Sequence, residues 1–99
     1  AMIDRQTYIT QLEESIQRWQ KEILKFKVIA EAEEAEPDAQ IEYYQVIQEI
    51  AEKQETIKNR LNVLKNEGNT TWNEEIKEEI EALSTSLDEA IESARVTIN

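Results

Sequence analysis

One proline and one glycine constrain this chain more than any other feature. Pro37 and Gly68 are the only residues of their kinds among 99, and they are the two residue types that most strongly end regular structure. They fall near one third and two thirds of the chain and leave three segments of about 30 residues. So little Gly and Pro favours long helices and effectively excludes sheet folds.

The apolar residues of each segment recur at alternating intervals of three and four. This is the heptad spacing of a helix with one buried stripe, which we call its seam. The seams are Ile9, Leu12, Ile16, Trp19, Ile23, Phe26 and Ala30 in the first segment, Tyr43, Ile47, Ile50, Gln54, Ile57, Leu61 and Leu64 in the second, and Ile76, Ile80, Leu83, Leu87, Ala90 and Ala94 in the third.

The seams also pair with a constant register. Facing residues of an antiparallel hairpin have sequence numbers with a constant sum, and pairing Leu12 with Leu61 gives 73 along the first two seams, which centres the turn at Pro37. The second and third seams give 137, beside Gly68. We predict an all-α fold, an antiparallel up-down-up three-helix bundle with coiled-coil-like heptad packing. Two alternatives use the same seams. One is a pairing shifted by one heptad, and the other is a helical hairpin that dimerises into a four- or six-helix assembly.

Residues at the segment ends predict where the helices begin and end. Asp4 is a candidate N-cap, Gly68 suits the left-handed position after a helix, and Thr71 with Glu74 forms a possible capping box. Ala1 is interpreted as a cloning remnant ahead of a start methionine. One domain over residues 1–99 is expected, with helices at about 4–35, 38–67 and 71–98.

The charge and the missing residue types exclude several functions. The chain has no cysteine or histidine, and 22 acidic against 11 basic residues give a net charge of −11. We therefore expect no catalytic, cofactor or metal site of ordinary type, and no enzyme. An acidic surface is a poor partner for nucleic acid. No apolar run is longer than three residues, as in Val28-Ile29-Ala30, so no segment is expected to span a membrane. A membrane is not the expected partner, and the cytoplasm is the expected location.

Two clusters of charge invite a binding role. Carboxylates crowd positions 31–38 and 74–81, but neither stretch has the spacing of an EF-hand, and a solvated acidic face is the preferred interpretation. The cationic set Arg18, Lys21, Lys25 and Lys27 would suit lipid or an acidic partner. Glu14 and Glu22 lie close enough to compensate it, so a solvated face is again preferred.

Aromatic residues and one glutamine are the candidate interaction or register residues: Trp19, Gln54, Trp72, Tyr8 and Tyr44. Trp19 and Gln54 share a layer of the register, so a hydrogen bond between indole N–H and amide is predicted. Trp72 and Tyr8 lie at the same end of the bundle. There Trp72 could cap the core or stay open to a partner, and we favour capping.

The register also predicts ion pairs beside the seams. It places Glu13 opposite Lys58 on one flank of the first hairpin and Glu22 opposite Lys53 on the other. Only one flank of the first helix can face the second helix in a compact bundle. The pair that forms should therefore report the handedness of the turn.

Several stretches resemble a group of small bacterial coiled-coil proteins of the apolipoprotein-like helical-bundle kind. They are Trp19-Gln20-Lys21-Glu22-Ile23, Ile41-Glu42-Tyr43-Tyr44, Leu61-Asn62-Val63-Leu64-Lys65 and Thr71-Trp72. The resemblance spans nearly the whole chain and implies a stand-alone helical protein without a catalytic site. Pro37 departs from the alanine- and acid-rich first turn of that group.

These observations predict a non-enzymatic acidic helical-bundle scaffold or protein-interaction module. It would act through an unknown protein partner or self-association. The alternative is a reversible binder of lipid or membrane surfaces whose amphipathic helices open. Interfacial helices are usually rich in Lys and Arg on the polar face, and these helices are not.

Added salt should raise the melting temperature of the protein. A net charge of −11 on a small body produces self-repulsion, and salt screens exposed charges beyond about 10 Å at 0.1 M. Thermal unfolding followed by circular dichroism over a salt series checks this. A melting temperature that falls steadily with salt would mean that attractive ion pairs dominate the surface.

Overall fold

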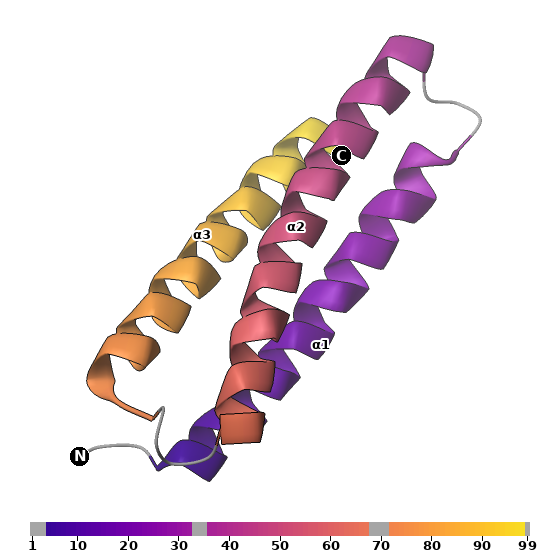
Figure 1. Ribbon diagram of the computed structural model, residues 1–99. Helices are drawn as coiled ribbons and strands as arrows, with labels where there is room; N and C mark the ends of the chain where they lie inside the picture. The colour runs from indigo at the N-terminus through magenta and orange to yellow at the C-terminus, as the bar shows by residue number, and fades with distance from the viewer. Residues whose placement is uncertain (1–3, 33–35, 68–71, 99) are drawn as a thin grey trace.

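The computed structural model is a bundle of three helices, α1 (Arg5–Ala30), α2 (Pro37–Glu67) and α3 (Glu74–Ile98). It describes residues 4–32, 36–67 and 72–98. Successive helices run in opposite directions, so α1 and α3 are parallel, and both pack along α2 (Figure 1). The bundle is a rod of 50 × 19 × 18 Å. The predicted all-α three-helix bundle is confirmed.

Side chains fix both ends of α1. The Asp4 carboxylate accepts hydrogen bonds from the Thr7 backbone N–H at 2.8 Å and the Thr7 hydroxyl at 3.0 Å, and these bonds lower the pKa of Asp4. The predicted N-cap is therefore confirmed. At the other end the Gln40 amide donates to the Ala30 carbonyl at 3.1 Å. This bond satisfies a helix-end acceptor from outside, and α1 ends at Ala30, short of the predicted 35.

The other two helices begin at residues that suit a helix start. α2 begins at Pro37, one residue earlier than predicted, because proline is favoured in the first turn, where its missing N–H costs nothing. α3 begins at Glu74 after Asn73, whose side-chain oxygen accepts from the Ile76 N–H at 2.9 Å. α3 thus begins three residues after the predicted start at about 71. Thr71 of the proposed capping box and Gly68 lie outside the described residues.

The seams form the core. Every seam residue is buried or half-buried, and Ile57, Ile80 and Leu87 have no measurable exposure. Tyr8, Ile91 and Ile98 join the core although they lie off the seams. Burial of this continuous apolar stripe supplies most of the favourable free energy of folding.

Gln54 is the one buried polar residue of the described core, and its partner differs from the prediction. Its amide donates to the backbone carbonyl of Ile16 at 3.2 Å. The indole N–H of Trp19 instead donates to Asp88 on α3. The predicted hydrogen bond between Trp19 and Gln54 is wrong, because the polar edge of the indole is turned toward α3 while Gln54 reaches the backbone of α1.

The flanking ion pairs also differ from the prediction. Glu13 pairs with Lys65 at 3.1 Å, and Lys58 pairs with Glu55 on its own helix. Glu22 pairs with Arg95 of α3. One flank of α1 therefore faces α2 and the other faces α3, and the Glu22 flank is too far around the helix to meet α2.

Replacing Gln54 with leucine should leave the free energy of unfolding unchanged or raise it. The Ile16 carbonyl lies within α1 and keeps its helical partner, so no buried acceptor is stranded by the change. A buried polar residue at a seam position can also specify register and oligomeric state. Thermal melts and light scattering on Gln54→Leu check both effects, and a sharply lower melting temperature with one clean species would show that the amide is indispensable.

Candidate binding groove between α1 and α3

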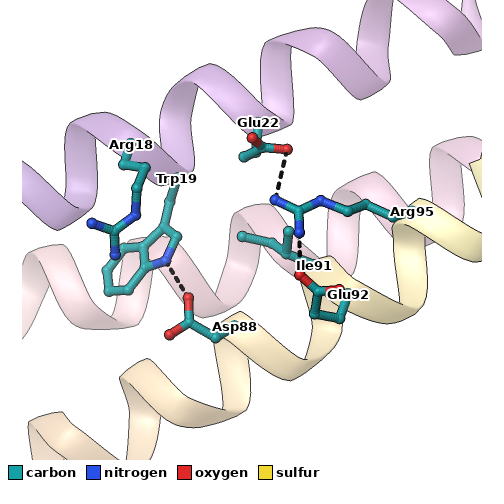
Figure 2. Close-up of a pocket in the computed structure, with 7 residues that line it drawn as sticks. All are labelled: Arg18, Trp19, Glu22, Asp88, Ile91, Glu92 and Arg95. Carbon is teal, nitrogen blue, oxygen red and sulfur yellow. Dashed lines mark hydrogen bonds and ion pairs between the residues drawn. The ribbon is translucent and has the colours of Figure 1, made fainter.

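A groove between α1 and α3 contains a cavity of about 130 Å³. We call it the α1–α3 groove. Ligand pockets for drug-sized molecules usually enclose ~300–1,000 Å³, so this one suits a single small group. Its lining residues are Arg18, Trp19, Glu22, Asp88, Ile91, Glu92 and Arg95 (Figure 2).

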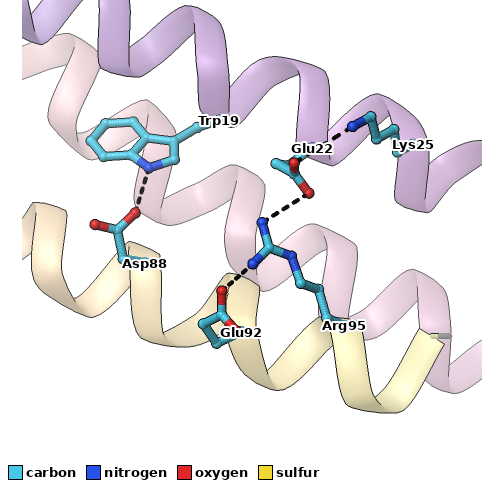
Figure 3. Close-up of polar contacts among 6 residues, drawn as sticks. All are labelled: Trp19, Glu22, Lys25, Asp88, Glu92 and Arg95. Carbon is cyan, nitrogen blue, oxygen red and sulfur yellow. Dashed lines mark hydrogen bonds and ion pairs between the residues drawn. The ribbon is translucent and has the colours of Figure 1, made fainter.

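Trp19 connects the floor of the groove to the core. The residue is only 2% exposed because its ring fills a seam position. Its Nε1 donates a hydrogen bond of 2.8 Å to a carboxylate oxygen of Asp88, which stands at the surface of α3 (Figure 3). An acceptor that carries charge strengthens such a bond. The indole therefore satisfies its only polar group across the α1–α3 boundary.

A chain of charged side chains crosses the same boundary toward the C-terminal end of α3. Glu22 lies 3.4 Å from the Arg95 guanidinium and 3.7 Å from the Lys25 ammonium. Arg95 also pairs with Glu92, one turn earlier on α3 (Figure 3). These pairs are partly exposed, and such pairs usually contribute ~0–1 kcal/mol each. They set how α1 and α3 face each other more than they stabilise the fold.

The chemistry of the groove is that of paired charges. Two arginines and three carboxylates line it, and Arg95 is shared between Glu22 and Glu92. Within the described ranges, no three carboxylates lie in a position to hold a metal ion. Positions 33–35 of the acidic turn are outside those ranges. None of the helices, as far as the structure describes them, is both long and apolar enough to cross a membrane.

The remaining candidate residues lie elsewhere. The Tyr8 and Trp72 rings meet edge to face, with centroids 5.1 Å apart, at the end of the bundle where α1 begins. Burial, together with the nearby Glu81 carboxylate, raises the pKa of Tyr8 to about 12. Trp72 is half-buried against the core, which agrees with the capping interpretation. Tyr44 stands exposed on α2.

The sequence placed Trp19 on the buried seam, as the structure does, but it predicted neither the groove nor the partners of Trp19 there. Asp88 directly follows the seam residue Leu87, and Arg95 follows Ala94 in the same way. The two antiparallel registers together place Trp19 level with Leu83 and Glu22 level with Ser86. The observed partners, Asp88 and Arg95, lie further along α3, so the sequence register did not lead to them.

Comparison with known proteins finds no matching family model, no similar curated protein and no similar solved structure. The resemblance to bacterial coiled-coil proteins accordingly stays a prediction.

Replacing Asp88 with alanine should lower the free energy of unfolding by about 1–3 kcal/mol, because it strands the buried Trp19 N–H. Glu78→Ala is the matched control, since Glu78 is an exposed acid on the same helix, and it should change stability by less than about 0.5 kcal/mol. Denaturant unfolding measures both variants.

A double-mutant cycle with Trp19→Phe isolates the hydrogen bond from the change of charge. In the Trp19→Phe background, Asp88→Ala should cost little more than the Glu78→Ala control. An equal loss in both backgrounds would show that Asp88 acts independently of the indole.

Proposed function

We propose that the protein is a non-enzymatic scaffold or protein-interaction module that binds through the outside of its helices. The interior supports this role, because the seams fill it and the groove is small and lined by paired charges. The strongly acidic composition supports this role as well, because the net charge restricts binding to partners whose surface charge is complementary at the contact.

The observation that carries the proposal is the placement of exposed apolar side chains. Leu24 and Val28 lie in the last two turns of α1, and Ile41 and Tyr44 lie in the first two turns of α2. Because the two helices are antiparallel, all four residues belong to the same end of the bundle (Figure 1). Leu24 is 50% exposed and Ile41 is 59% exposed. Apolar residues gathered at one end of a small protein are typical of a binding surface.

Binding to a lipid surface is the second candidate, and one observation favours it. Lys21 and Lys25 are exposed on α1 beside Leu24 and Val28, which combines apolar and cationic groups on one helix face. Such a face binds anionic lipid when the apolar area is large. In this protein the combined apolar and cationic area is limited to one helix face, and the chain has a net charge of −11. We therefore rank protein binding above lipid binding.

Site-specific photocrosslinking tests the proposal. A photoreactive amino acid at Ile41 should give discrete crosslinked protein species in cells. The matched control is Asn59, which is exposed and lies five helical turns along α2 in the same direction. Identical crosslinks at Ile41 and Asn59 would contradict protein binding at this end of the bundle. The absence of crosslinks, together with sedimentation of the protein on liposomes at ordinary salt, would also contradict it.

A further inference from the structure

The face of the bundle that carries the α1–α3 groove is divided into two edges of opposite charge. The cationic edge consists of Arg18, Lys21 and Lys25, all exposed on α1. Residues 15–30 contain a single acid, Glu22, which pairs with Arg95 of α3 and with Lys25 of this edge. Positive charge on this edge is therefore concentrated within a protein that is acidic overall.

The anionic edge lies on α3, on the other side of the groove. Glu89 and Glu92 are exposed, with Glu81 two turns earlier on the same helix. Arg95 is a cation on the same side of the groove, and it pairs with Glu92 and Glu22. Glu92 lines the groove, and Glu89 precedes it by three residues, so the two belong to neighbouring positions on one helix face.

The contacts across the groove place the two edges level with each other. Trp19 bonds to Asp88 and Glu22 pairs with Arg95, so the α1 segment that holds Lys21 and Lys25 runs beside Glu89 and Glu92. Each edge also carries an exposed valine further toward the end of the bundle where α1 and α3 finish. Val28 on α1 is 71% exposed and Val96 on α3 is 85% exposed, the highest values among the large apolar residues described.

We propose that this face binds the same face of a second copy of the chain. A two-fold axis parallel to the helices would place α1 of each copy against α3 of the other. Lys21 and Lys25 of each copy would then meet Glu89 and Glu92 of the other, with Val28 near Val96 at both contacts. Two-fold interfaces require this kind of self-complementary surface. The proposal rests on the proposed interaction role and names its partner.

Size and the local arrangement of charge favour a second copy as the occupant, while the net charge of −11 on each chain opposes association and weakens the dimer at low salt. One long side of the rod measures 50 by 19 Å, so the two copies must meet along most of this side if each is to bury the roughly 800 Å² of a standard interface. A uniformly anionic membrane would attract the cationic edge and repel the anionic edge of the same face. Only a partner with both signs at the same spacing matches both edges, and a copy of this chain has that arrangement.

Charge reversal with rescue tests the dimer. Analytical ultracentrifugation of the wild-type chain should show a mass that rises toward two chains as concentration increases. The variant Lys21→Glu/Lys25→Glu and the variant Glu89→Lys/Glu92→Lys each place like charges at both contacts, and each should weaken the dimer about tenfold or more. An equal mixture of the two variants has complementary edges at both contacts and should restore dimers.

The control is Lys27→Glu/Lys58→Glu, which has the same net charge as the first variant. Lys58 lines the groove between α1 and α2, and Lys27 lies two heptads after Glu13 on the flank of α1 that faces α2. This control should dimerise more strongly than Lys21→Glu/Lys25→Glu. Circular dichroism confirms that every variant remains helical.

Three results would overturn the proposal: a wild-type chain that is monomeric at every concentration, dimers that survive both edge reversals, or a mixture that fails to associate. A monomeric wild type that still forms crosslinks to other proteins from Ile41 would leave the proposed interaction role in place. A different result would assign the cationic edge to membrane binding. In that case the wild-type chain forms no dimer but sediments with anionic liposomes, and Lys21→Glu/Lys25→Glu abolishes this sedimentation.

Discussion

The structure depends on one constraint, which is that the seam of α2 must cover two other seams at once. α1 and α3 both pack along α2, and the Gln54 and Lys65 side chains reach α1 while Arg60 pairs with Glu79 on α3. With α2 placed between them, α1 and α3 become parallel neighbours that meet along a boundary of their own. That boundary is joined at its surface by Trp19, Asp88, Glu22 and Arg95, and there the groove forms.

The features that the sequence predicted well are those that depend on periodicity. Heptad spacing identified the buried face of each helix, and Asp4 marked the start of α1 because a capping carboxylate acts locally. The partners of flanking residues could not be predicted in the same way. A modest rotation of each helix about its axis keeps the seam buried but decides whether Glu22 meets Lys53 or Arg95.

The groove residues illustrate the same limit. A buried tryptophan needs an acceptor for its N–H, and the antiparallel register offered Gln54. In the bundle the acceptor is Asp88, because the Trp19 ring lies at the boundary with α3. The segregation of charge on the α1–α3 face arises from the same geometry. Arg18 to Lys25 and Glu89 to Glu92 are far apart in sequence and become the two sides of one surface only when α1 and α3 lie parallel.

The distance between α1 and α3 tests the central claim that one chain satisfies all three seams. Spin labels at Gln11 and Glu78, both exposed, should give a single short distance near the 19 Å width of the bundle by pulsed electron paramagnetic resonance. The distance should persist when labelled chains are diluted with excess unlabelled chain. A signal that disappears on dilution, or a distance approaching the 50 Å length of the rod, would mean that the seams are shared between chains and that α1 and α3 are not neighbours.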